Sequence, residues 1–140
     1  MNIKLINYGG IMPVRKHIND VGADVYTKNY EYILPHSTVK VPLGFGIILP
    51  ENYAAFVYPR SSISALSIGV QLPPIDPGYT GEIHAIITNY SSEKVCFDQH
   101  SRIGQLVVIP FINANFEWAK PNEIPESDRG VNAFGSTGIF

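Results

Sequence analysis

The sequence has little charge and almost no cysteine. Its single cysteine, Cys96, excludes an intrachain disulfide and a cluster of cysteine metal ligands. Charged residues make up 16% of the chain, against about 25% in an ordinary soluble domain. The net charge of −2 argues against a basic nucleic-acid-binding module. Because a small domain has much surface to cover with so few charges, we expect part of that surface to be buried against other subunits.

Long apolar runs and targeting signals are also missing. No uninterrupted apolar stretch approaches the length that spans a membrane. The first residues, Met1 to Leu5, lack the basic and apolar regions of a signal peptide. We therefore expect a cytoplasmic protein with neither a membrane nor a nucleic acid as partner. The 140 residues fit a single domain over 1–140.

Turn residues and strand formers are abundant instead. The 12 glycines, 11 prolines, 8 tyrosines and 7 phenylalanines favour an all-β fold. Short apolar segments separated by turn residues predict strands at 4–7, 30–34, 37–42, 45–49, 54–58, 83–90, 94–97, 102–112 and 116–118. Many short strands are typical of a sandwich, barrel or jelly roll. One short helix is expected at 62–67, and Cys96 is expected to be buried.

Two polar segments in the first half of the chain are candidates for binding. Asp24 lies among small and apolar residues, where a turn aspartate is the simpler interpretation. Arg60, Ser61 and Ser62 open the expected helix. They could present a guanidinium, hydroxyls and backbone N–H groups to a phosphate. A helix cap beside a surface arginine is the alternative.

The segment 72–82 combines two prolines, Asp-Pro-Gly and a further glycine, which predicts a rigid hairpin. The backbone of such a hairpin could offer donors and acceptors to a planar ring. Asp76 at its tip could act as a general base. A tight turn without further function is the alternative.

Two further polar segments lie in the second half. Arg102 and Gln105 are three residues apart on an apolar strand, so they point to opposite faces unless a bulge intervenes. Polar residues at a strand edge are the alternative. Near the end of the chain, Arg129 and a lone Phe134 precede Gly-Ser-Thr-Gly. This composition can cradle a phosphate and stack on a base, and a disordered tail is the alternative.

In this order the five segments resemble the motifs of the homotrimeric dUTP diphosphatase (dUTPase) family across nearly the whole chain. The matching stretches are Gly22-Ala23-Asp24, Pro59-Arg60-Ser61-Ser62, Ile75 to Glu82, Arg102 to Leu106, and Arg129-Gly130 with Phe134 to Gly138. The resemblance implies a jelly-roll-like, distorted β-barrel with one short helix and a flexible C-terminal tail. It also implies a homotrimer in which each active site is built from all three subunits. Residues 121–140 would form a mobile arm that closes over a neighbouring subunit's site.

The same resemblance implies a reaction. Family members hydrolyse dUTP to dUMP and pyrophosphate with Mg²⁺, by attack of water on the α-phosphorus. This limits uracil incorporation into DNA and supplies dUMP for dTMP synthesis. A competing hypothesis is a binding module, in which the trimer binds a regulatory protein and the nucleotide acts as a switch. The presence of Asp76, Arg129 and Phe134 argues against a pure loss of catalysis.

The sequence departs from the family pattern at four places, and the stretch between its second and third motifs is a few residues shorter than usual. Ser62 and Pro73 stand where glycines are usual, His100-Ser101 replaces Gly-Asp, and Asn132-Ala133 replaces two glycines. None of these changes removes a charged or stacking group. Asn tolerates a positive φ and Ala does so poorly, so the tail is expected to close along a slightly different path.

The related dCTP deaminases also carry Arg-Ser-Ser and Ile-Asp-Pro-Gly. They have an arginine where Ala65 stands here, and a catalytic glutamate near Ala85 to Ile87. With no acid at that strand, proton transfer to a cytosine amine has no agent. We therefore reject deamination.

The resemblance assigns roles to the matching residues. The expected substrate-binding residues are Arg60, Ser61, Ser62, Pro74, Ile75, Asp76, Tyr79, His84, Arg102, Gln105, Arg129, Phe134, Gly135, Ser136 and Thr137. Asp76 is the expected catalytic base. Asp24 and Gln105 would meet Mg²⁺ through water, since this ion keeps several of its waters.

Specificity for dUTP is expected from the hairpin and the tail. The backbone around Pro74 and Ile75, with the strand near His84, would pair with the uracil edge in a slot too narrow for a 5-methyl group. Tyr79 would pack under the sugar and exclude a 2′-hydroxyl, and Phe134 would stack on the base. His84 is expected to contribute backbone and no proton transfer.

Overall fold

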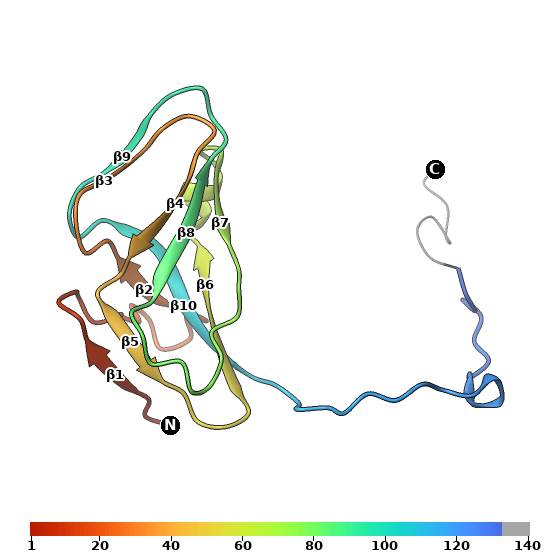
Figure 1. The fold of residues 1–140 in the computed structure, drawn as a ribbon. Helices are drawn as coiled ribbons and strands as arrows, with labels where there is room; N and C mark the ends of the chain where they lie inside the picture. Colours follow the sequence, from red (N-terminus) through yellow and green to blue (C-terminus); the bar gives the residue numbers. More distant parts are fainter. Residues whose placement is uncertain (133–140) are drawn as a thin grey trace.

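The computed structural model describes residues 1–132. The strands are β1 (Lys4–Asn7), β2 (Ala23–Tyr26), β3 (Glu31–Ile33), β4 (Thr38–Pro42), β5 (Phe45–Ile48), β6 (Tyr53–Pro59), β7 (Ile68–Gln71), β8 (His84–Asn89), β9 (Val95–Phe97) and β10 (Arg102–Pro110). A short helix α1 (Ser61–Ser64) separates β6 from β7, and a 3-10 turn η1 (Pro121–Glu123) follows β10. The strands form four small antiparallel sheets with the orders β1-β5, β2-β10-β6, β3-β9 and β4-β8-β7. Figure 1 shows these sheets wrapped around one interior, which confirms the expected all-β, barrel-like fold.

Strand β8 shows how the sequence pattern builds the core. Its residues alternate between half-buried and buried from His84 to Asn89, as a strand with one face on the core requires. Asn89 is fully buried, and its side-chain amide donates hydrogen bonds to the carbonyls of Ile33 and Glu93 at 3.0 and 2.7 Å. A buried amide satisfied in this way ties β8 to β3 without a desolvation penalty.

Most of the predicted strands are confirmed, with ends that shift by one or two residues. Strands β2 and β7 were not predicted, because β2 carries an aspartate and β7 a glycine among only four residues each. The prediction of a strand at 116–118 is wrong, since that stretch pairs with nothing in residues 1–132. The prediction of a buried Cys96 is also wrong. This residue lies opposite Tyr32 in the β3-β9 pair, on its exposed face.

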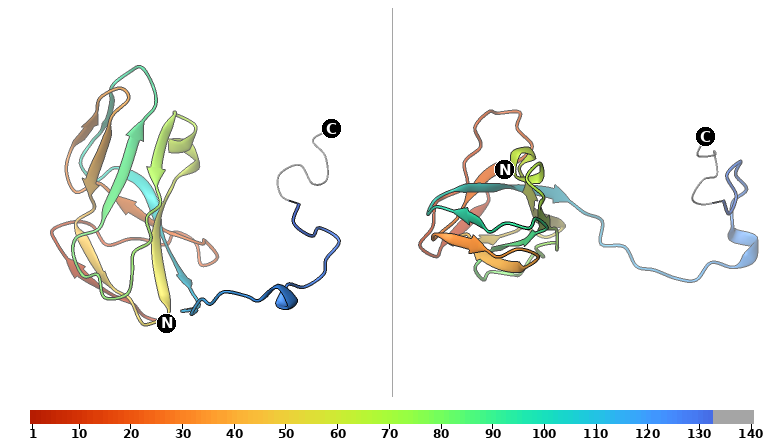
Figure 2. Two further views of the ribbon diagram at one scale, coloured as in Figure 1. Left: turned by 45° about the vertical axis from the view of Figure 1, so that its right-hand side comes forward. Right: turned by 90° about the horizontal axis from the view of Figure 1, so that it is seen from above.

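The chain beyond β10 leaves the barrel as an extended arm. Figures 1 and 2 show residues 111–132 reaching away from the strands, with η1 as their one regular turn. The side chains of Phe116 and Trp118 on this arm are 94% and 100% exposed. A segment with such exposed aromatic side chains is typical of one that packs against another surface.

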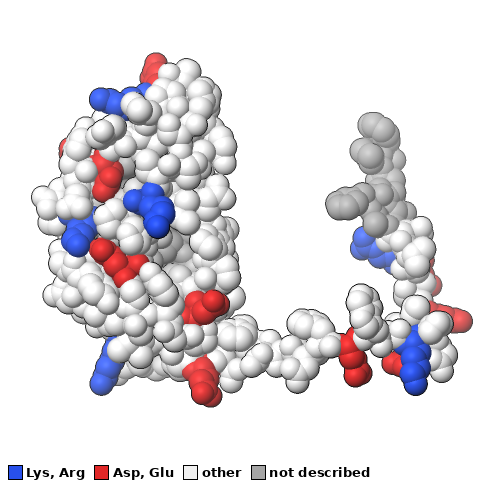
Figure 3. All heavy atoms as spheres, viewed as in Figure 1, with Lys and Arg blue, Asp and Glu red and all other residues white. Residues whose placement is uncertain are grey.

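Charged side chains are sparse on the barrel face seen in Figure 3, as the composition indicated. Among residues 1–132, no helix is long and apolar enough to cross a membrane.

Candidate active site

A cavity of about 290 Å³ lies between the β7-β8 connection and residues of strands β4, β6, β7 and β8. We call it the hairpin pocket; it is lined by Lys40, Val57, Gln71, Pro73, Pro74, Ile75, Asp76, Tyr79, Glu82, Ile83, His84 and Ile86. Five of the six residues predicted to bind the nucleoside or the attacking water, all except Phe134, are among them. They are Pro74, Ile75, Asp76, Tyr79 and His84.

Backbone hydrogen bonds fix the wall of the hairpin pocket. The N–H of Ile75 donates to the carbonyl of Ala55 at 2.8 Å, and the N–H of Ala55 donates back to Ile75 at 3.2 Å. This two-residue bridge joins the hairpin to β6. Pro73 and Pro74 precede it and restrict their own φ angles, so the wall is rigid where a planar ring would rest.

The tip of the hairpin is a compact turn around Asp76. The N–H of Tyr79 donates to the carbonyl of Asp76 at 3.2 Å, and Gly78 adopts a φ of +95° that suits glycine. The hydroxyl of Tyr79 donates to the carbonyl of Glu82 at 3.0 Å. A Cβ at Gly81 would lie 2.7 Å from that hydroxyl, so a larger residue there would displace the Tyr79 ring. The turn holds the exposed Asp76 side chain at the edge of the cavity.

A second group of predicted residues gathers on the β2-β10-β6 sheet. We call Asp24, Arg60, Arg102 and Gln105 the polar patch. Nη1 of Arg102 lies 3.1 Å from Oδ2 of Asp24. Nη1 of Arg60 donates to the carbonyl of Arg102 at 3.2 Å. The Arg60 guanidinium therefore lies against the backbone of Arg102, whose own guanidinium pairs with the Asp24 carboxylate.

A β-bulge places Arg102 and Gln105 on the same face. Arg102 pairs with Tyr26 and Gln105 with Asp24, and the register shifts between Arg102 and Gly104. Since Tyr26 and Asp24 are two apart on β2, their partners face the same way. The sequence predicted that the Arg102 and Gln105 side chains point to opposite faces unless a bulge intervenes. The bulge is present, so they point to one face.

Glycine makes room for the side chain of Gln105. A Cβ at Gly22 would lie 2.6 Å from Oε1 of Gln105 and 2.8 Å from its Cβ. The first motif thus contributes the Asp24 carboxylate and also Gly22, which leaves space for the Gln105 side chain because it has no Cβ. Close packing of this kind fixes the position of the amide on the sheet surface.

The serines of the second motif lie next to the polar patch. Ser61 and Ser62 are exposed in α1, which is anchored by the buried Ile63. Arg60 occupies the N-cap position, and no side-chain cap hydrogen bond is present there. The alternative interpretation of these serines, as capping residues, therefore finds no support in α1.

The bridge that joins the hairpin to β6 and the Arg60 of the polar patch lie at different points along this strand. Ile75 bridges to Ala55, whereas Arg60 follows the last residue of the strand. Five residues of extended chain span roughly 16 Å. Along β6, the Ala55 bridge beside Asp76 is therefore separated from Arg60 by about this distance.

The predicted arm residues are only partly described. Nε of Arg129 donates to the carbonyl of Asn132 at 2.9 Å, within the arm. Phe134, Gly135, Ser136 and Thr137 lie outside the described residues.

The side-chain oxygens of Asp24 and Gln105 in the polar patch suit a hydrated magnesium ion. Asp24 and Gln105 pair directly across β2 and β10, which places both side chains on one face of the sheet. Among residues 1–132, no group of three or more His, Cys, Asp or Glu side chains could enclose a metal. Mg²⁺ usually keeps several waters and takes one or two carboxylates together with substrate phosphates. The two oxygens fit that sparse, water-mediated mode.

Sequence reasoning assigned no role to Glu82 of the third motif, which also lines the hairpin pocket, and it missed two polar residues outside the motifs. Lys40 reaches it from β4, and Gln71 from the unpredicted strand β7. Neither lies in a recognised motif. Both residues pair with Ile86 of β8, which places them beside the pocket. This strand register was not predictable from the sequence.

The β-barrel thus offers a pocket lined by two carboxylates, those of Asp76 and Glu82, and a separate polar patch with two arginines. This combination suits ligands that join a planar ring to several negative charges. Residues 9–138 match the model of the dUTPase family. The chain therefore belongs to this family, as the motifs predicted.

Relatives from bacteria carry the name deoxyuridine 5'-triphosphate nucleotidohydrolase. The protein from Streptomyces avermitilis is 39% identical over 91% of this chain and 74% of its own length. Those from Tropheryma whipplei and Clostridium tetani are 34% and 35% identical, each over 99% of this chain and 96% of their own.

Solved structures share the fold at low identity. A mutant dUTPase of Staphylococcus bacteriophage 80alpha with dUpNHpp has a TM-score of 0.91 at 21% identity, covering 99% of both chains. A mutant dUTPase from phage phi11 of S. aureus, described with a structural Mg(II) ion, has a TM-score of 0.82 at 18% identity. It covers 89% of this chain and 100% of its own.

Proposed function

We propose that this chain hydrolyses dUTP to dUMP and pyrophosphate. Membership of the dUTPase family supports the reaction. The observation that carries the proposal is the hairpin pocket, which gathers Asp76, Tyr79 and His84 with the two hairpin residues predicted to meet the base. Through this reaction the protein would limit uracil incorporation into DNA and supply dUMP.

In the proposed site the nucleoside enters the hairpin pocket. Uracil lies against the wall from Pro74 to His84, and the sugar packs on the ring of Tyr79, where a 2′-hydroxyl has no room. Asp76 orients a water molecule and accepts its proton as the oxygen attacks the α-phosphorus, with pyrophosphate leaving. The rigid tip around Gly78 supports this role because it holds the carboxylate at the pocket edge.

The polar patch binds the triphosphate in this proposal. Arg60 and Arg102 supply paired positive charge to phosphate oxygens, and Ser61 and Ser62 offer hydroxyls beside them. Asp24 and Gln105 hold the waters of Mg²⁺. When bound, this ion neutralises phosphate charge and orients the leaving group.

The active site is proposed to be shared between subunits of a homotrimer. The separation of Asp76 from Arg60 along β6 supports sharing, since a nucleotide bound at one hairpin pocket would need the polar patch of another copy. The exposed Phe116 and Trp118 support an arm that packs on a neighbour. The arm then delivers Arg129 to the phosphates, Phe134 to the base, and the backbone N–H groups of Gly135, Ser136 and Thr137 to the terminal phosphate.

Residues 121–140 act as the closing arm of this single 1–140 domain. Closure excludes bulk water and leaves one positioned water. A cytoplasmic location remains the expectation, because dUTP belongs to the cellular nucleotide pool.

A pyrophosphate-release assay tests the proposed function. The purified protein is supplied with Mg²⁺ and with dUTP, dCTP, dTTP or UTP in parallel. We expect dUTP to be hydrolysed with a far higher kcat/KM than the other three. Absence of pyrophosphate release from dUTP, by a protein that is folded and assembled, would refute the proposal.

A further inference from the structure

The hairpin ends at Glu82, a residue to which the family resemblance gave no role. Its side chain is only 23% exposed. Its Oε2 accepts a hydrogen bond from the backbone N–H of Gly44 at 2.9 Å, at the corner between β4 and β5. Nζ of Lys28 lies 3.4 Å from the same oxygen. We call Lys28, Gly44 and Glu82 the carboxylate clamp.

The carboxylate clamp lies within a row of backbone hydrogen bonds. The N–H of Leu43 donates to the carbonyl of Ile83 at 3.0 Å, and the N–H of Ile83 donates to the carbonyl of Phe45 at 2.8 Å. Between Leu43 and Phe45, the Glu82 side chain satisfies the N–H of Gly44. The clamp therefore strengthens the junction between the end of the hairpin and the β4-β5 corner, with a charge-assisted hydrogen bond.

The β4-β5 corner is itself held from its other side. The carbonyl of Gly44 accepts the N–H of Tyr8 at 3.0 Å and that of Gly10 at 2.9 Å. A Cβ on Gly44 would collide with the backbone of Gly10, so the two segments are in close contact. The carboxylate clamp thus ties the hairpin to a fixed support.

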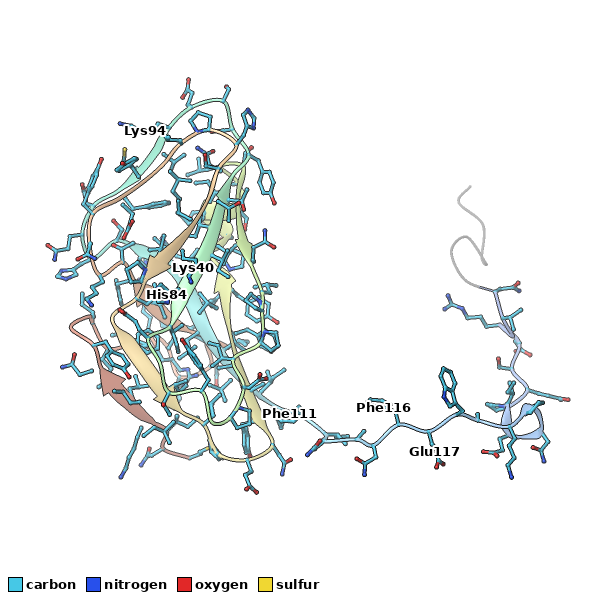
Figure 4. All side chains as sticks on the ribbon, viewed as in Figure 1. Lys40, His84, Lys94, Phe111, Phe116 and Glu117 are labelled. Atoms are coloured by element: carbon cyan, nitrogen blue, oxygen red, sulfur yellow. The ribbon has the colours of Figure 1, made fainter. Side chains whose placement is uncertain are left out.

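The backbone of Glu82 connects this support to two side chains of the hairpin pocket. Its carbonyl accepts the hydroxyl of Tyr79 at 3.0 Å, and Nδ1 of His84 lies 3.1 Å from the same oxygen. Figure 4 shows His84 at the start of β8, beside the end of β4. The position of Glu82 therefore determines where the rings of Tyr79 and His84 lie.

We propose that Glu82 is a positioning residue, whose clamped carboxylate fixes the Tyr79 ring at the place where the ring excludes a 2′-hydroxyl. This inference rests on the proposed function and assigns a role to Glu82 and to Lys28, which lies outside all five motifs. Steric exclusion requires a ring that cannot retreat, and a misplacement of about 1 Å can change a rate about 100-fold. A hairpin released from the corner would let the ring move and would admit UTP.

Three variants test the carboxylate clamp. Glu82→Ala removes the carboxylate, whereas Glu82→Gln keeps an acceptor for the N–H of Gly44 without the charge. Thr88→Val is the matched control, because it removes the 2.7 Å hydrogen bond between Thr38 and Thr88, which joins β4 to β8 outside the pocket. For each variant, kcat and KM are measured with dUTP and with UTP, and assembly and melting temperature are compared with the wild type.

We expect Glu82→Ala to lower the dUTP-to-UTP ratio of kcat/KM about tenfold. A protein that is merely destabilised loses active molecules for both substrates equally, so its ratio stays constant. Glu82→Gln should keep most of the ratio, and Thr88→Val should leave it unchanged. An unchanged ratio in Glu82→Ala, or an equal loss in Glu82→Gln, would overturn the inference.

Lys28→Met tests the cationic part of the clamp and serves if Glu82→Ala does not fold. It leaves the hydrogen bond to Gly44 in place but removes the positive charge beside the carboxylate, so the ratio should fall about threefold. An unchanged ratio would remove Lys28 from the clamp. Failure of the proposed function is distinguishable, because the wild type would then not hydrolyse dUTP at all.

Discussion

The hairpin pocket and the polar patch are assembled from the chain in different ways. Apart from Lys40 and Val57, the lining of the pocket comes from the continuous stretch 71–86. The polar patch combines residues that are far apart in the sequence, namely Asp24 of β2, Arg60 after β6 and Arg102 of β10. One region is a local hairpin, whereas the other exists only because β10 pairs with both β2 and β6.

This difference has a consequence for function. In the proposed function, each region supplies half of what a nucleoside triphosphate needs. Local sequence positions the Asp76 carboxylate and the hairpin wall, while strand pairing positions the cationic groups. We propose that a complete site forms where copies of the chain meet, and the following changes test this.

The largest effect is expected from Asp76→Asn in the hairpin pocket. The amide keeps the size of the side chain but cannot accept a proton, so kcat should fall about 10²–10⁴-fold. Binding of a non-hydrolysable dUTP analogue, measured by calorimetry, should stay nearly normal. Turnover close to that of the wild type would remove Asp76 from its role as base.

Mixing two inactive variants tests whether the regions act across subunits. Asp76→Asn and Arg60→Met affect the hairpin pocket and the polar patch respectively. When the two chains are co-expressed in equal amounts, about a quarter of sites should combine an intact pocket with an intact patch from different chains. Steady-state assays should then show activity well above either parent. No recovery in verified mixed oligomers would mean that both regions serve a site within one chain.

Deleting residues 129–140 removes the arm contacts while leaving both regions of the barrel intact. Loss of a stacking ring alone costs roughly 1–3 kcal/mol, so turnover should fall about 100-fold. Light scattering should still show a trimer, and Phe134→Ala should lie between the deletion and the wild type. Hydrolysis of dUTP at full rate by the shortened chain would show that the site closes by other means.

Gly22→Ala tests how closely the polar patch is packed. The added Cβ would lie 2.6 Å from Oε1 of Gln105, so the amide must move. A displacement of this kind should lower kcat/KM about tenfold, with the fold retained. Val21→Ala, which truncates an exposed neighbour, is the control. Equal activity in both variants would show that Gln105 has no positional role.

The smallest effect is expected on stability. Asp24→Asn breaks the ion pair with Arg102, whose two side chains are 21% and 37% exposed. Because solvent screens such a pair, the free energy of unfolding should fall by no more than about 1 kcal/mol. Urea denaturation measures this change. A loss of about 3 kcal/mol would instead identify the pair as a structural one.

The amino-acid sequence alone determined the fold class and the hairpin. Turn residues and short apolar runs predicted most strands, because local propensity and alternation agree with the final pairing there. The stretch 72–82 was predictable since its prolines and glycines restrict the backbone whatever surrounds it. The same local logic failed at 116–118, where aromatic residues favour a strand but no partner strand is present within residues 1–132.

Tertiary structure alone decided the polar patch and the side chains that enter the hairpin pocket. The bulge that turns Arg102 and Gln105 to one face depends on the pairing of β10 with β2. Lys40 and Gln71 reach the pocket only because both strands pair with β8. Strand register joins residues far apart in the chain, and no local pattern encodes it, so these contacts could not be predicted from the sequence.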